Sequence, residues 1–156
     1  MLQRIQSVYL FIVFIFAVLF GVLPLAYFPV DAPEMPLRLL QYRVFMDAFA
    51  EMYGQWLGGV LIVLFSAIML ITVYTTFQYK NRLHQIAMGK LNILLHVVLI
   101  MATFFFLDTI RGQVDATDFS YGPAVIFPVI SLIFILLSNK AIRKDENLVR
   151  AADRLR

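Results

Sequence analysis

Polar side chains inside a long apolar segment are the strongest candidates for chemistry in this sequence. Asn92 and His96 are four residues apart, so a helix places both on one face, and Thr103 extends that face toward Asp108. Polar groups at membrane depth are costly and usually point into a helix bundle. The chemistry open to this face is haem ligation, quinone contact or proton relay. The structural alternative is an interhelical hydrogen bond that holds the helices together.

The number and positions of the histidines favour an interhelical hydrogen bond over haem ligation. A bis-histidine haem needs a second buried histidine, and the other histidine, His84, falls in a polar loop. We therefore assign Asn92 and His96 to helix packing and keep His96 as a weak candidate for cofactor binding. No cofactor is expected.

Signatures of catalysis are absent from the sequence. It contains no cysteine, which excludes disulfides, iron–sulfur clusters and thiolate zinc sites. It also has no buried carboxylate pair, no Ser/His/Asp set at comparable depth, no His–Glu metal spacing and no glycine-rich phosphate loop. The sequence therefore predicts a protein that is not an enzyme, without catalytic or metal-binding residues.

Uncharged segments determine the predicted fold class. Four of them, 5–30, 52–79, 91–107 and 119–139, approach or exceed the roughly 20 apolar residues that a helix needs to cross a bilayer. The hydrophobic fraction of 62% and the mean hydropathy of +0.83 are those of a membrane protein. We predict an all-α fold, a single-domain four-helix transmembrane bundle over residues 1–156 with a cytoplasmic C-terminal amphipathic helix.

The expected limits of the spans follow from charges, prolines and aromatic belts. The spans are residues 6–28, 53–79, 91–107 and 121–139. External loops cover 29–52 and 108–120, a cytoplasmic loop covers 80–90, and the cytoplasmic tail covers 140–156. Pro24 is expected to bend or end the first helix. The first external loop contains many apolar residues, so it either covers the bundle at the headgroup level or docks a partner. A short strand over residues 39–44 is an open alternative there.

The charges predict the orientation of the chain. Ten basic and three acidic residues fall at the termini and in the 80–90 loop, against three basic and seven acidic residues in the external loops. Lys and Arg concentrate in short cytoplasmic loops. Both termini are therefore expected in the cytoplasm. Because topology and anionic lipid headgroups explain the basic excess, the expected partners include the lipid bilayer and no nucleic acid.

Two further patterns concern packing and docking. Gly54 and Gly58 have the small-xxx-small spacing that lets two helix backbones approach closely, either within the bundle or in a homo-oligomer. Residues 139–156 continue the last span as a helix with a narrow apolar seam. That helix either lies on the membrane surface or docks a partner through its charged residues, which are Arg143, Asp145, Glu146, Arg150, Asp153 and Arg154.

Three segments carry a resemblance to a known family. They are MLQRIQSVYL at 1–10, YKNRLHQI at 79–86 leading into LNILL at 91–95, and NKAIRKDENLVRAADRLR at 139–156. Together they resemble a family of uncharacterised bacterial four-span integral membrane proteins, a domain of unknown function, and the match covers the whole chain. The resemblance implies a location in the bacterial cytoplasmic (inner) membrane and implies no activity. Its most specific part is the C-terminal run, on the cytoplasmic face.

These observations lead to one expected function and two alternatives. We expect a non-enzymatic accessory or assembly subunit of a larger membrane protein complex, which docks membrane protein partners through its cytoplasmic face. The first alternative is a homo-oligomeric small-solute or ion pathway, in which Asn92, His96 and Thr103 would face a wet axis. The second is a haem- or quinone-associated redox subunit.

Overall fold

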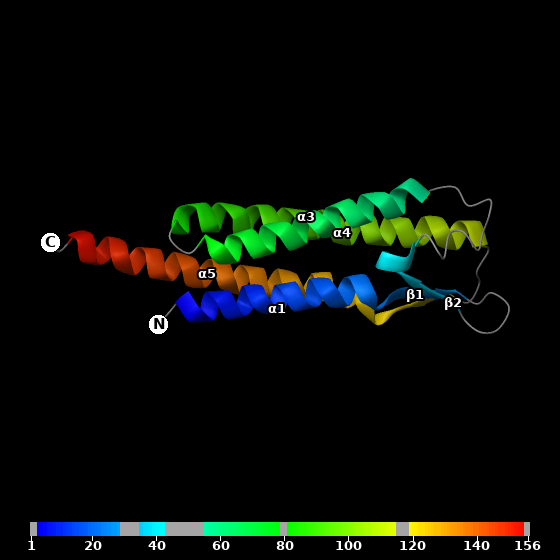
Figure 1. The fold of residues 1–156 in the computed structure, drawn as a ribbon, viewed down its shortest axis with the longest axis horizontal. Coiled ribbons are helices and arrows are strands. Elements are labelled where there is room, and N and C mark those ends of the chain that lie inside the picture. Colours follow the sequence, from blue (N-terminus) through cyan, green and yellow to red (C-terminus); the bar gives the residue numbers. More distant parts are fainter. Residues whose placement is uncertain (1–2, 29–34, 43–54, 79–80, 115–118, 155–156) are drawn as a thin grey trace.

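Four long helices form the body of the molecule in a computed structural model, which describes residues 3–28, 35–42, 55–78, 81–114 and 119–154. They are α1 (Gln3–Val22), α3 (Gln55–Phe77), α4 (Arg82–Val114) and α5 (Ile126–Arg154). All four are long and apolar enough to span a membrane, as predicted. They lie alongside one another, with both ends of the chain at the same end of the bundle (Figure 1).

Burial follows the same period along every helix. Buried positions alternate at steps of three and four residues, with partly buried Phe65 completing the step on α3. The buried positions that follow this step are Gln6, Leu10, Val13, Ala17 and Phe20 on α1; Gly58, Leu61, Ile68, Thr72 and Thr75 on α3; Gln85, Gly89, Asn92, His96, Leu99, Thr103, Phe106 and Ile110 on α4; and Pro128, Ser131, Ile135, Ser138 and Ile142 on α5. Gly21, Leu107 and Asn139 are also buried, each next to one of these positions. A mean step of about 3.5 residues is the repeat of left-handed coiled-coil packing. The opposite faces expose large apolar side chains such as Val63, Leu94 and Ile133, as lipid contact requires.

A small antiparallel sheet closes the end of the bundle opposite the termini (Figure 1). It contains β1 (Pro24–Phe28), β2 (Met35–Arg38) and β3 (Ser120–Tyr121) in the order β2-β1-β3. The Gly122 amide donates a hydrogen bond to the Leu25 carbonyl at 2.8 Å, and a side chain at position 122 would collide with the Pro24 carbonyl. The expectation of an all-α fold is therefore incomplete, because residues expected at the end of the first span form the central strand.

Proline explains this difference. Pro24 has no amide hydrogen to donate within a helix, so α1 ends at Val22 and the chain leaves extended. The open alternative of a strand over 39–44 is wrong for its first three residues. Leu39–Gln41 form a 3-10 helix, η1, directly after β2. Residues 43 and 44 lie outside the described part of the chain.

The other helix ends differ from the expected spans for a common reason. Helix α4 begins at Arg82 and ends at Val114, so it contains most of the expected 80–90 loop and part of the 108–120 loop. Helix α5 begins later than expected, after a 3-10 turn, η2 (Pro123–Val125), and continues without a break to Arg154, as predicted for the residues that follow the last span. Charges mark where a helix can leave the apolar layer, whereas its hydrogen bonding continues into the polar region.

Candidate functional site

Polar side chains from all four helices are buried between the middle of the bundle and the end that holds the termini. We call this set the polar core. Its members are Gln6 on α1; Thr72 and Thr75 on α3; Gln85, Asn92 and His96 on α4; and Ser131, Ser138 and Asn139 on α5. Toward the sheet the seams are mainly apolar. Thr103 lies there, and its hydroxyl donates within its own helix to the Leu99 carbonyl at 2.7 Å.

Two amide side chains of α4 join it to α3. The Asn92 amide nitrogen donates to the Thr72 hydroxyl oxygen at 2.9 Å, and that hydroxyl donates to the Ile68 carbonyl at 2.8 Å. The Gln85 amide nitrogen donates to the Thr75 carbonyl at 3.1 Å. In a membrane interior each such bond stabilises helix association by about 0.6 kcal/mol on average. The polar core thus includes an interhelical connection at Asn92.

His96 contributes differently from the expected interhelical bond. Its Nδ1 lies 2.8 Å from the carbonyl oxygen of Asn92, one turn earlier on α4. A carbonyl only accepts, so Nδ1 carries the hydrogen in this contact. His96 and Ser131 line a cavity of about 10 Å³ among aromatic side chains of α1 and α3. That volume is about enough for one water molecule and far below the size of a haem or a quinone ring.

The second histidine is placed outside this core. His84 lies on the first turn of α4, and its Nε2 is 3.3 Å from the hydroxyl oxygen of Tyr74 on α3. It is separated from His96 by twelve positions of the same helix, or about 18 Å along its axis. The two rings therefore cannot ligate one haem iron. The described residues also contain no group of three His, Cys, Asp or Glu side chains that could hold a metal ion.

Three buried atoms of the polar core have no hydrogen-bond partner among the described residues. They are Gln6 Nε2, Asn92 Oδ1 and Ser138 Oγ. Such atoms usually bond to water or to a ligand, because an unpaired buried polar group is costly. The polar core can therefore hold water or a small polar group, but it offers no nucleophile–base pair and no acid–base pair for catalysis.

The glycines expected to pack helices divide into two cases. Gly58 is buried against the ring of Tyr42, which follows η1, and an added side chain would overlap that ring. It therefore accommodates the segment that follows β2 rather than a neighbouring helix. Gly54 lies outside the described residues.

A close helix approach occurs at Gly89 instead, where the Asn139 amide of α5 lies so near that an added side chain would overlap it. This contact was not predicted from the sequence, because only pairs of small residues were considered there. Gly89 could have been recognised from its spacing, since it lies four residues after Gln85 and three before Asn92, on the same face of α4.

Part of the expected docking set is engaged within the chain. Arg82 Nη2 and Asp145 Oδ2 form an ion pair at 3.0 Å that joins the start of α4 to α5. Asp145 therefore stabilises contact between two helices of this chain. Arg143 is exposed and Glu146 is partly buried. Nothing is described of the side chains of Arg150, Asp153 and Arg154. Past Asp145, Leu148 and Val149 are 52% and 40% exposed, and the C-terminal end of α5 extends beyond the other helices (Figure 1).

Four apolar helices of membrane-spanning length, with polar side chains turned inward, indicate a multi-pass membrane protein. The chain belongs to the DUF4293 family, a domain of unknown function, whose family model matches residues 2–155. The resemblance noted in the sequence is thereby confirmed. No curated protein and no solved structure matches the chain.

Proposed function

We propose that this protein is a non-enzymatic accessory or assembly subunit of a larger membrane protein complex in the bacterial inner membrane. It docks its partner through the cytoplasmic face, with both termini on that side. The observation that carries the proposal is the end of α5, which extends past its ion pair with α4 and exposes Leu148 and Val149. This end contains the most specific part of the family resemblance.

Contact with a partner protein would bury the exposed apolar side chains of Leu148 and Val149. The four residues that precede this pair on α5 are charged or polar, and two of them, Lys144 and Asn147, are exposed as well. Burying a Val or Leu side chain completely yields about 1.5–3 kcal/mol relative to full exposure. A helix end with no bundle beside it can obtain part of this energy by packing against a second protein.

The orientation in this proposal rests on the charges. The described basic side chains near this end of the bundle include Arg82, Lys90, Lys140, Arg143 and Lys144. Such an excess favours the cytoplasmic side, because positively charged loops are retained there during insertion. The docking end and the positive end coincide.

The interior of the bundle supports docking over a solute pathway. Asn92, His96 and Thr103 are buried within one chain, with no more than 3% of each side chain exposed. A wet axis between copies of the chain would not contain them in this packing. The cavity beside His96, at about 10 Å³, is too small for a continuous path.

Copurification from native membranes tests the proposal. The tagged protein is isolated in mild detergent as the wild type, as Leu148→Ser/Val149→Ser, and as the control Lys144→Ser/Asn147→Ser on the same turns of α5. Proteins that accompany the wild type and the control should be lost with the first variant, while its abundance in the membrane fraction stays unchanged. Identical sets of accompanying proteins from all three would refute docking through this end of α5.

A further inference from the structure

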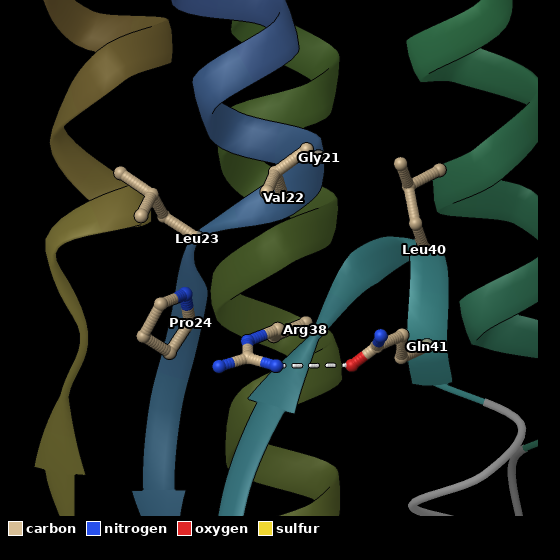
Figure 2. A pocket seen from close by; sticks show the side chains of 7 residues that line it. All are labelled: Gly21, Val22, Leu23, Pro24, Arg38, Leu40 and Gln41. Carbon is tan, nitrogen blue, oxygen red and sulfur yellow. Dashed lines mark hydrogen bonds between the residues drawn. The ribbon is translucent and has the colours of Figure 1, made fainter.

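A second feature of the molecule lies at the opposite end of the bundle. An apolar groove with a volume of about 370 Å³ is bounded by the last turn of α1, the start of β1, the end of β2 and η1. Its lining residues are Gly21, Val22, Leu23, Pro24, Arg38, Leu40 and Gln41 (Figure 2). The volume falls in the lower part of the roughly 300–1,000 Å³ range of small-molecule sites.

One charged group lies among the apolar lining. Arg38 Nη1 donates a hydrogen bond to Gln41 Oε1 at 3.2 Å, and the two side chains point toward each other at one side of the groove (Figure 2). A guanidinium has five N–H donors, and this is the hydrogen bond that Arg38 makes among the described residues. Gln41 therefore orients the guanidinium while leaving donors free for an anionic oxygen.

The surroundings of the groove are those of a membrane interface. Val22 and Leu40 are more than half exposed, and every exposed side chain of α1 from Val8 to Val22 is apolar. Trp56 at the start of α3 and Tyr121 in β3 are exposed at the same end of the bundle, and Trp and Tyr are the residues that gather at the edge of the bilayer. An apolar cleft beside a cation at this depth is complementary to a lipid, which carries its phosphate directly above its acyl chains.

We propose that this groove binds one phospholipid of the adjacent leaflet, with an acyl chain in the groove and the phosphate on the Arg38 guanidinium. Guanidinium and phosphate form paired, charge-assisted hydrogen bonds. The apolar wall at Val22, Leu23 and Leu40 selects a ligand with a hydrocarbon chain over a free anion. This proposal does not depend on the identity or existence of a docking partner.

Native mass spectrometry of the purified full-length protein tests this site. The protein in detergent is titrated with phosphatidylglycerol, with diacylglycerol of the same chains, and with inorganic phosphate. We expect one bound phosphatidylglycerol at low concentration, binding of diacylglycerol weaker by about tenfold or more, and no retained phosphate. Diacylglycerol binding as tight as phosphatidylglycerol would overturn the role of Arg38, and phosphate competing fully with lipid would identify a free-anion site instead.

Matched variants assign the bound lipid to the groove. Arg38→Gln should weaken phosphatidylglycerol binding about tenfold, whereas Arg111→Gln, at the same end of the bundle but outside the groove, should not. Val22→Trp should fill the groove and abolish the high-affinity lipid, whereas Val18→Trp, one turn earlier and outside the lining, should retain it. Unchanged binding in both Arg38→Gln and Val22→Trp would overturn the proposal.

Discussion

At the scale of single residues, the polar core shows how position determines the role of a polar group in the membrane. The Asn92 amide nitrogen bonds to the Thr72 hydroxyl of another helix, whereas the Asn92 carbonyl oxygen Oδ1 and the Ser138 hydroxyl have no partner among the described residues. Removing a bonded group costs the hydrogen bond, while removing an unpaired group relieves a desolvation penalty. The two kinds of substitution should therefore have opposite signs.

A pair of variants checks this expectation. Asn92→Leu should lower the free energy of unfolding by about 1 kcal/mol, because the connection between α4 and α3 is lost. Ser138→Ala should leave that free energy unchanged or raise it slightly. Both are measured by unfolding with SDS in mixed micelles, followed by circular dichroism. A Ser138→Ala variant as unstable as Asn92→Leu would contradict the account.

The sequence located this site only in part. The spacing of Asn92 and His96 in an uncharged segment was sufficient to predict an inward-facing pair. It could not supply Thr72 as the partner of Asn92, because the register between helices depends on packing along their whole length. The bond of His96 also escaped prediction. A side chain one turn away from a carbonyl of its own helix can bond to it without any partner helix.

At the scale of elements, close packing between α4 and α5 depends on one glycine. Gly89 allows the Asn139 amide to lie against the backbone of α4, at the level where the polar core begins. Alanine normally strengthens a helix relative to glycine by about 1 kcal/mol. Here its methyl group would have to displace a buried amide.

Alanine substitutions separate these two effects. Gly89→Ala should destabilise the protein by about 1–3 kcal/mol, because it overpacks the contact with Asn139. Adding Asn139→Ala should recover much of that loss. Gly112→Ala is the control, since an added methyl group there meets nothing within 4 Å, and it should cause no loss of stability. The same SDS titration measures the free energy of unfolding of each variant. Equal changes in that free energy for Gly89→Ala and Gly112→Ala would show that the contact with the Asn139 amide is unimportant.

Helix number was predictable from the sequence, as were the end of the first helix near Pro24 and the continuation of the last helix beyond residue 139, but the ends of α4 and the sheet were not. A long uncharged segment identifies a membrane span, because every backbone N–H and C=O group in the apolar layer must form a hydrogen bond within the protein, as it does in a helix. It does not identify where α4 ends, since Arg111 continues the helix beyond the uncharged region. The strand Pro24–Phe28 is as apolar as the helix before it, and it pairs both with Met35–Arg38, which is close in sequence, and with Ser120–Tyr121, which is distant in sequence.

At the scale of the whole molecule, the bundle has two chemically different ends. The termini, the polar core and the extended α5 lie toward one end, and the sheet and the apolar groove lie at the other (Figure 1). We propose a binding role for each end: a protein partner on the side of α5 and a lipid at the groove.

Site-specific photo-crosslinking in intact membranes tests docking through α5 most directly. A photoreactive amino acid is placed at Leu148, which is exposed past the ion pair, or at Ile133, which is exposed on the lipid-facing side of the same helix. The account predicts a discrete adduct between position 148 and a different membrane protein, and no such adduct from position 133. An adduct from 148 only with a second copy of this chain, or no protein adduct at all, would contradict it.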